Sequence, residues 1–246
     1  MKDIKAVLFD LDGTIYYGSK LIDGAAEVVD AYRKKGMKVF FMTNNSTKSR
    51  KDIYNRLMKM GLKCDINEIY TSSYAAALYS KRKGYKSVYI FGTKGLKDEF
   101  ELIGIKSSNE ADVVVIGYDM DMDYQKLTEA LQVALNAKAL IACNREKNYP
   151  GENAKRMPGC GAMVGALECS VGRKVDYVVG KPNPLLLDII CTEQGLDKSE
   201  IMVIGDTFES DIEMSNEYGC DSIYIGDEEH EKNTCVKNIR EILDIM

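Results

Sequence analysis

Short apolar runs alternate with amphipathic stretches along almost the whole of this 246-residue chain. The apolar run at 5–10 is followed by an amphipathic stretch at 24–36, and a second apolar run covers 37–43. Apolar runs of about 4–8 residues are typical of buried strands, whereas longer periodic stretches are typical of helices. Strands that alternate with helices in this way form parallel sheets. The alternation therefore predicts an α/β fold with a Rossmann-like parallel-sheet core.

Composition narrows the classes of function. A net charge of -5 disfavours a partner that is a nucleic-acid polymer, because such a role usually needs a basic face. The apolar runs are far shorter than a membrane span, and the first residues do not resemble a secretory signal, so we expect a cytoplasmic protein with no membrane partner. Seven cysteines without a C-x-x-C pair argue against a disulfide framework and a zinc site. The single histidine, His230, lies in an acidic stretch that we expect to be solvated surface.

Polar residues follow four of the predicted strands. The four sets are Asp10 with Asp12, Thr43 with Asn44, Gly180 with Lys181, and Gly205 with Asp206, with Asp211 five residues later. Ligands of an open parallel sheet bind beyond the carboxyl ends of its strands. We therefore expect these four sets to form one site.

The acids in these sets favour a hard metal ion. A spacing of two places the side chains of Asp10 and Asp12 on the same side of an extended chain, and Gly13 allows the backbone to turn away afterwards. Together with Asp206 they would make an oxygen-rich site of the kind that Mg²⁺ prefers.

The other polar residues favour a phosphoryl group as the ligand. Lys181 adds a positive charge, and Thr43 and Asn44 add a hydroxyl and an amide. A carboxylate about 4 Å from a phosphate dianion meets roughly 8 kcal/mol of repulsion at an effective dielectric constant near 20. Mg²⁺ and a lysine would offset that repulsion, which gives a reason to place acids at the end of a buried strand.

Each motif also has a simpler interpretation when it is taken alone. The first acids do not fit a calcium loop, since Ile15 stands where glycine is needed and Leu21 where glutamate is needed. The segment around Thr43 resembles a turn and a helix cap, and Lys181 resembles a turn lysine. A common site is favoured because all four motifs occur in order along the chain and each follows the end of a predicted strand.

With these residues assembled, the chain resembles the haloacid dehalogenase superfamily of aspartate-nucleophile phosphotransferases. The residues that carry the resemblance are Asp10-Leu11-Asp12-Gly13-Thr14, Thr43-Asn44, Lys181 and Gly205-Asp206 with Asp211, and they span nearly the whole chain. The sequences of these motifs and their order are most similar to those of the NagD-like and para-nitrophenyl phosphatase-like subgroup.

The spacing of the motifs predicts an inserted domain. Thr43 lies 33 residues after Asp10, which leaves room for one helix and one strand, whereas Lys181 lies 138 residues after Thr43. A single crossover needs far fewer residues. We therefore expect a catalytic core at 1–81 and 179–246 and an inserted α/β cap domain at 82–178, where the resembled family carries its large cap.

The resemblance implies a mechanism and a role for each core residue. Asp10 would form an aspartyl-phosphate, and Asp12 would protonate the leaving alcohol and then activate water. Mg²⁺ would be bound by Asp10, the Asp12 main-chain carbonyl and Asp206. The phosphoryl group would be bound by Thr43, Asn44 and Lys181. Asp211 would position either the waters of the metal or Lys181. A second acid suits a leaving group that needs a proton, so it favours phosphoesters over haloalkanes.

The cap is expected to select the substrate. Its polar run at 144–161 offers Asn144, Arg145, Tyr149 and Arg156 as candidate specificity residues, with the arginines available for a second anionic group and Tyr149 for a ring. Relatives often carry Asn-Pro-Asp here, whereas this chain has Asn144-Arg145-Glu146, so the identity of the substrate does not carry over. The resemblance also implies a homodimer formed through the cap.

Three functions are compatible with these residues. The leading hypothesis is Mg²⁺-dependent hydrolysis of small phosphate monoesters, such as sugar phosphates, nucleoside monophosphates or pyridoxal phosphate. A phosphotransferase or mutase is the second, although mutases of the family usually carry a cap between the first two motifs. A catalytically silent protein that binds a phosphorylated ligand is the third, and such a protein would be expected to have lost Asp10 or Asp12.

Overall fold

The computed structural model describes residues 3–150, 155–228, 230 and 232–246, and the chain divides into two compact units. The first unit comprises Met1–Thr43, Ile53–Tyr70 and Lys181–Met246, and the second comprises Asn44–Asp52 and Thr71–Gly180. The predicted insert at 82–178 lies inside the second unit, which begins earlier in the sequence and also takes in 44–52.

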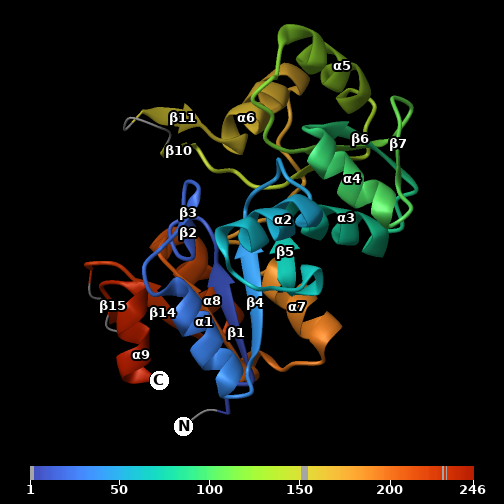
Figure 1. Ribbon diagram of the computed structural model, residues 1–246. Coiled ribbons are helices and arrows are strands. Elements are labelled where there is room, and N and C mark those ends of the chain that lie inside the picture. The colour runs from blue at the N-terminus through green and yellow to red at the C-terminus, as the bar shows by residue number, and fades with distance from the viewer. Residues whose placement is uncertain (1–2, 151–154, 229, 231) are drawn as a thin grey trace. The chain divides into compact units, whose positions relative to one another are not determined.

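The first unit is built on a six-stranded sheet, and β1 lies in its interior (Figure 1). In spatial order its strands are β15 (Thr234–Val236), β14 (Asp221–Ile225), β13 (Ile201–Gly205), β1 (Ala6–Asp10), β4 (Lys38–Thr43) and β5 (Ile69–Thr71). The pairs β15–β14, β14–β13, β13–β1 and β1–β4 are all parallel. The predicted α/β class with a parallel-sheet core is confirmed.

The register of these strands brings the predicted motifs to one edge. Asp10 pairs with Met42 of β4, and Phe9 pairs with Ile204 of β13. Thr43, the last residue of β4, and Asp206, which directly follows β13, are therefore both close to the level of the end of β1. All five residues of β1 are buried, because both faces of the sheet are covered, and this is why the strand reads as a continuous apolar run.

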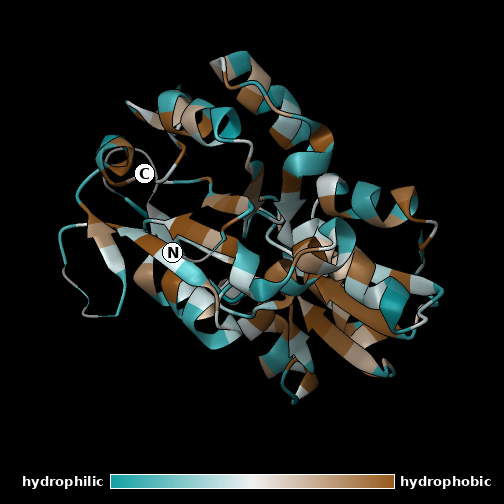
Figure 2. Ribbon diagram, turned by 90° about the horizontal axis from the view of Figure 1, so that it is seen from below, coloured by the Kyte–Doolittle hydropathy of each residue, from teal (hydrophilic) through white to brown (hydrophobic). Residues whose placement is uncertain are grey.

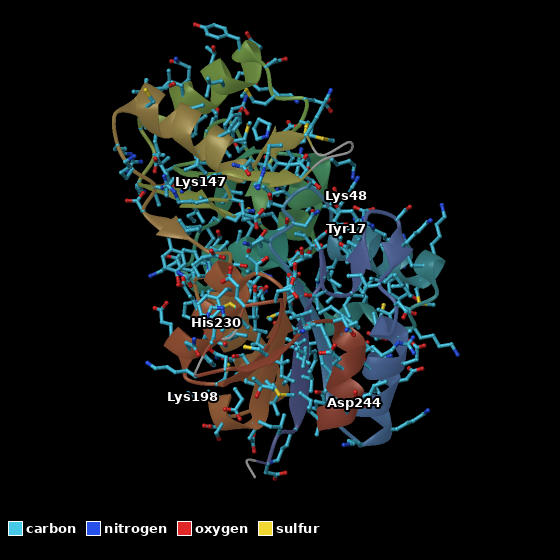
Figure 3. All side chains as sticks on the ribbon, turned by 90° about the vertical axis from the view of Figure 1, so that its left-hand side faces the viewer. Tyr17, Lys48, Lys147, Lys198, His230 and Asp244 are labelled. Carbon is cyan, nitrogen blue, oxygen red and sulfur yellow. The ribbon has the colours of Figure 1, made fainter. Side chains whose placement is uncertain are left out.

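Helices cover both faces of this sheet (Figures 1 and 3). They are α1 (Ala25–Lys34), α2 (Arg50–Met60), α7 (Leu185–Gln194), α8 (Glu213–Tyr218) and α9 (Ile242–Ile245). One apolar cluster packs Val28, Val29 and Tyr32 of α1 against Phe9 of the sheet. In Figure 2 the strands are mostly brown, the colour of apolar residues, and the helices carry teal polar residues as well.

A compact loop follows β1 and leads into a small hairpin. The backbone of Tyr16 closes a tight turn, in which its carbonyl accepts from the Gly13 N–H at 2.9 Å and its N–H donates to the Leu11 carbonyl at 3.1 Å. Strands β2 (Tyr16–Tyr17) and β3 (Lys20–Leu21) then pair antiparallel. These two-residue strands have no periodicity that sequence reasoning can detect.

The second unit has its own sheet of five strands and its own core. In spatial order the strands are β12 (Tyr177–Val178), β9 (Ala139–Ala142), β8 (Val113–Ile116), β6 (Ser87–Phe91) and β7 (Lys106–Ser107). The unit's other elements are α3 (Ser72–Arg82), α4 (Lys94–Leu102), α5 (Tyr124–Ala134), α6 (Cys160–Val171) and the hairpin of β10 (Asn148–Pro150) with β11 (Arg156–Pro158).

The placement of β12 corrects one expectation. The strand that precedes Lys181 was predicted as part of the sheet that carries Asp10, but β12 pairs with β9 of the second unit. Lys181 itself is the first residue of the chain's return to the first unit. None of the helices among the described residues has the length and apolar character needed to span a bilayer.

Candidate active site

Lys181 lies between two of the predicted acids. Its ammonium contacts Asp10 Oδ1 and donates to Asp211 Oδ1 at 2.6 Å. The side chains of all three residues are almost entirely buried. Asp10 comes from the end of β1, whereas Asp211 comes from a π-helical turn, Phe208–Ile212, that follows β13. The structure therefore joins residues that lie 171 and 30 positions apart in the sequence.

The π-helical turn fixes Asp211 close to the end of β13. The Asp211 N–H donates to the Thr207 carbonyl at 2.8 Å, and the Thr207 N–H donates back to Asp211 Oδ2 at 3.2 Å. Gly205 makes room for this side chain, since a Cβ there would lie 2.4 Å from Asp211 Cγ. One oxygen of Asp211 is thus held by its own turn, and the other accepts from Lys181.

Three carboxylates form a group that fits a metal ion. Asp10, Asp206 and Asp211 each offer an oxygen, and these oxygens lie within 4.8 Å of one another. Burial raises the pKa of Asp10 well above its usual range; Lys181 opposes this rise, and the charges of Asp211 and Asp206 add to it. Burial also raises the pKa of Asp206.

One lysine does not balance these three acids. Burial acts to lower the pKa of Lys181, but the carboxylates of Asp10 and Asp211 outweigh it and raise the pKa, so the ammonium keeps its charge. Three carboxylates and one ammonium leave an excess of negative charge in a buried place, where charge is costly. A divalent cation bound by oxygen ligands would remove that excess. The residues present therefore fit the metal that the motifs predict.

Thr14 and Gly13 hold Asp206 in position. The Thr14 hydroxyl donates to Asp206 Oδ1 at 2.7 Å, and Thr14 is fully buried. Gly13 has φ +98°, and a Cβ built there would lie 2.2 Å from Asp206 Oδ2. Glycine is needed here both for its backbone conformation and for the close approach of a carboxylate.

Substitution of Gly13 by alanine should therefore damage the site more than the fold. The added methyl group would push the Asp206 carboxylate out of the three-acid group and would strain the backbone by about 1–3 kcal/mol. We expect at least a tenfold rise in the metal concentration needed for half-maximal activity, about the loss typical of disturbed ligand orientation. Gly18→Ala is the matched control, because Gly18 also has positive φ (+55°) but no atom of the described part of the chain lies within 4 Å of its Cβ position. Equal metal requirements in the two variants would contradict the assigned role of Gly13.

Asp12 has a different hydrogen-bond partner from the three acids of the group. Asp12 is an exposed residue, and its carboxylate accepts from the Tyr16 hydroxyl at 2.9 Å in a partly buried contact. Partial desolvation by its surroundings raises the pKa of Asp12, and the hydrogen bond from Tyr16 and the charge of Arg56 oppose this rise. Among the described residues, one oxygen of this side chain, Oδ2, accepts a side-chain hydrogen bond. Binding of the metal by the Asp12 main-chain carbonyl stays a prediction.

Thr43 and Asn44 fall on the two sides of the unit boundary. Thr43 is buried at the end of β4, one residue beyond the partner of Asp10. Asn44 belongs to the second unit, where its Nδ2 donates to Glu146 Oε1 at 2.9 Å and its carbonyl accepts from the side chains of Ser72 and Asn144. Their assignment as phosphate ligands stays a prediction.

The candidate specificity residues of the second unit are engaged within that unit. Arg145 makes a bidentate ion pair with Glu168, with N···O distances of 2.7 and 3.0 Å. Tyr149 shares a 3.0 Å hydrogen bond with another tyrosine hydroxyl, and Arg156 donates to Asn148 at 2.8 Å. Part of the polar run in which they lie, residues 151–154, is outside the described residues.

Sequence reasoning missed two supporting residues and misjudged a third. Thr14 and Tyr16 make side-chain hydrogen bonds to Asp206 and Asp12, yet only Thr14 lay inside a recognised motif. His230 is not a solvated surface residue as expected: its ring stacks on Phe208, with centroids 3.7 Å apart, and its side chain is 24% exposed. No local pattern signals such a contact between distant parts of the chain.

Comparison with known proteins identifies the class of this site. The family model of the haloacid dehalogenase-like hydrolases matches residues 7–106, and a second model of hydrolases of this type matches residues 178–242. The acidic edge of the parallel sheet and these two matches define the chain as a haloacid dehalogenase-like hydrolase.

Individual relatives narrow the class further. The chain is 37% identical to sugar-phosphatase AraL of Bacillus subtilis over 223 residues, which cover 89% of this chain and 82% of AraL. The crystal structure of a 4-nitrophenylphosphatase from Thermotoga maritima matches with a TM-score of 0.92 at 30% identity, covering 99% and 97% of the two chains. A solved structure named as a NagD protein matches with a TM-score of 0.91, also at 30% identity, covering 97% and 96%. The chain belongs to the haloacid dehalogenase-like phosphatases of the NagD-like and nitrophenyl phosphatase-like subgroup.

Proposed function

We propose that this phosphatase hydrolyses small phosphate monoesters with the help of Mg²⁺ and through an aspartyl-phosphate on Asp10. The observation that carries the proposal is the grouping of Asp10, Asp206 and Asp211 around the ammonium of Lys181 at the carboxyl edge of the first unit's sheet. This grouping combines a nucleophile, a fixed positive charge and a set of oxygen ligands.

Asp10 would act as the nucleophile. One of its oxygens attacks phosphorus in line as the bond from phosphorus to the ester oxygen breaks, so the phosphoryl group passes to Asp10. Lys181, which already contacts Asp10 Oδ1, would bind an oxygen of the transferred group and stabilise its charge. Thr43 and Asn44 would add neutral donors.

Asp12 would move the protons. It gives a proton to the leaving alcohol oxygen in the first step and takes one from water in the second, when that water releases phosphate from Asp10. Asp12 therefore ends the cycle as it began, protonated. Asp12 is an exposed residue whose carboxylate accepts a hydrogen bond from Tyr16, and this exposure supports the role because a substrate oxygen can approach it.

The metal would be held by the Asp10 and Asp206 side chains and by the Asp12 main-chain carbonyl. When bound, Mg²⁺ supplies positive charge that offsets the repulsion between a carboxylate and a phosphate dianion. Asp211 would orient Lys181, which its carboxylate already contacts, and Thr14 would orient Asp206.

The second unit, with the insert at 82–178, would act as the cap that selects the substrate. Sugar phosphates are the first substrates to test, since AraL is named a sugar phosphatase, followed by nucleoside monophosphates and pyridoxal phosphate. Asn144, Arg145, Tyr149 and Arg156 remain the candidate specificity residues. A cytoplasmic location and a homodimer belong to the same proposal.

A panel of phosphate monoesters tests the proposal directly. We expect phosphate release from several sugar phosphates in the presence of Mg²⁺, and a fall to about 1% or less after treatment with EDTA, since the charge of the metal is worth several kcal/mol. Readdition of Mg²⁺ should restore the rate. Formation of a new phosphate ester instead of phosphate would indicate a phosphotransferase, and saturable binding without turnover would indicate a silent binding protein.

A further inference from the structure

We infer that Tyr16 is a positioning residue for Asp12: its hydroxyl holds Asp12 Oδ2, so that Oδ1 is the oxygen that exchanges protons with the substrate and water. This inference rests on the proposed role of Asp12 as the acid and base. It assigns a task to a buried tyrosine that the mechanism does not otherwise use.

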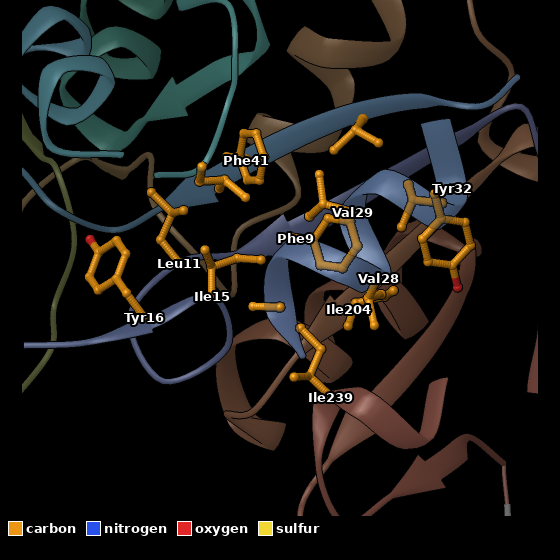
Figure 4. Close-up of a cluster of buried hydrophobic side chains, with 14 of the residues drawn as sticks. Phe9, Leu11, Ile15, Tyr16, Val28, Val29, Tyr32, Phe41, Ile204 and Ile239 are labelled. Carbon is orange, nitrogen blue, oxygen red and sulfur yellow. The ribbon is translucent and has the colours of Figure 1, made fainter. Parts of the chain in front are cut away.

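The hydrogen bond between Tyr16 and Asp12 is fixed by the surrounding fold, because the tyrosine is buried. Tyr16 is fully buried, and its hydroxyl donates to Asp12 Oδ2 at 2.9 Å. Figure 4 shows its ring beside Leu11 at the end of the apolar cluster, with the hydroxyl oxygen pointing away from the other labelled apolar side chains. The two backbone hydrogen bonds of Tyr16, to Gly13 and Leu11, fix its main chain within the same turn that carries Asp12.

Arg56 of α2 lies over the tyrosine ring. The centre of its guanidinium lies 4.3 Å from the ring centroid, and one of its terminal nitrogens donates to the carbonyl of Gly18 in the β2–β3 hairpin. A cation over an aromatic face is attracted to it. The ring of Tyr16 is therefore restrained by the apolar cluster, by its own backbone and by Arg56.

Restraint of one carboxylate oxygen makes the two oxygens of Asp12 unequal. A tyrosine hydroxyl titrates near pH 10 in water, so at neutral pH it donates a hydrogen bond and does not itself act as the base. With Oδ2 occupied, the proton that leaves for the ester oxygen departs from Oδ1 as the phosphorus–oxygen bond breaks. The proton taken from the attacking water returns to Oδ1, so the two steps balance. Without the Tyr16 hydroxyl, Asp12 would rotate freely and would less often present a protonated oxygen to the leaving group.

The test compares Tyr16→Phe with Tyr32→Phe on two kinds of substrate. Tyr32 is a matched control because it is a buried tyrosine of the same apolar cluster but lies on α1. An alkyl phosphate such as glycerol phosphate needs a proton on its leaving oxygen, whereas 4-nitrophenyl phosphate has a leaving group that departs without one. Proton transfer by a positioned group contributes about 10²–10⁴-fold. Only the first step distinguishes the two leaving groups, so it is measured as release of the alcohol in a single turnover. For Tyr16→Phe we expect this rate to fall by about 10–100-fold for the alkyl phosphate and by no more than about 3-fold for 4-nitrophenyl phosphate, with the half-saturating substrate concentrations nearly unchanged.

Two further measurements separate positioning from damage to the fold. Thermal unfolding should show Tyr16→Phe and Tyr32→Phe folded at the assay temperature. In an Asp12→Asn background, Tyr16→Phe should cause little further loss, because the two residues act as one unit. An equal loss on both substrates, no loss on either, or a full additional loss in the Asp12→Asn background would overturn the inference. Failure of the proposed function is distinguishable, since it would appear as wild-type protein that releases no phosphate from either substrate.

Discussion

Replacement of Asp10 by asparagine is expected to abolish phosphate release, with a loss of about 10⁴-fold or more in kcat, the scale seen when a nucleophile is removed. An amide cannot attack phosphorus, and the other two carboxylates of the group are already engaged: Asp211 by Lys181 and its own turn, and Asp206 by the Thr14 hydroxyl. The measurement is phosphate release at saturating Mg²⁺ from the best substrate of the panel.

The same variant should remain folded, which separates lost chemistry from lost structure. A raised pKa means that the folded protein holds a proton on Asp10 more tightly than the unfolded chain does, so the ionised form lowers stability as pH rises above its usual value near 3.8. Asparagine removes that charge. In EDTA we therefore expect Asp10→Asn to unfold at a temperature no lower than wild type does. Asp30→Asn, at an exposed position on α1, should leave both activity and stability unchanged. Residual metal-dependent turnover in Asp10→Asn would contradict the assignment of the nucleophile.

Replacement of Lys181 by methionine is expected to damage both activity and stability. Methionine would leave the carboxylates of Asp10 and Asp211 buried without their shared cation. Removal of one partner from a buried ion pair costs about 3–5 kcal/mol. For a chain of this size that corresponds to a fall of about 6–20 °C in the midpoint of thermal unfolding. We expect kcat to fall by about 10³-fold, as it does when one charge-stabilising donor is lost.

The pH dependence of this loss follows from the two pKa shifts. The pKa of Lys181 is raised above its ordinary value of 10.5, so its contribution to stability is fully present at neutral pH and is lost only above that value. The pKa of Asp10 is also raised, so acidification neutralises one of the stranded carboxylates. The difference in unfolding free energy between wild type and Lys181→Met, measured without metal, should therefore be larger at pH 8 than at pH 5. Lys198→Met, at an exposed position of the same unit, is the control. A difference that grows toward pH 5 would contradict this account of the cluster.

Much of the first unit could be predicted because its sequence is locally consistent. The strands β1, β4 and β13 are short apolar runs that are followed at once by polar residues, and parallel pairing at one edge follows from their alternation with helices. The prediction that Asp10 and Lys181 lie together was correct, but part of the reasoning behind it was wrong. Lys181 was placed at the end of a strand of the same sheet, whereas the preceding β12 belongs to the second unit and only the chain beyond it returns.

The remaining features depend on information that no local pattern carries. The two-residue strands β2 and β3 are too short for any periodicity, so the turn that places Tyr16 against Asp12 could not be predicted. Membership of 44–52 in the second unit depends on long-range contacts such as that between Asn44 and Glu146. The ion pair of Arg145 with Glu168 depends on side-chain geometry, so sequence reasoning treated that arginine as available to a ligand.

The strand order of the first unit also matters while the chain is being synthesised. β1 lies between β4, which follows it closely, and β13, which is made almost 200 residues later. Until Ile201–Gly205 leaves the ribosome, one side of the buried strand β1 has unpaired amide and carbonyl groups, and an edge of this kind promotes association with other chains. A product truncated before Ile201 would keep that edge permanently open, so fragments of this protein should aggregate where the full-length chain stays dispersed.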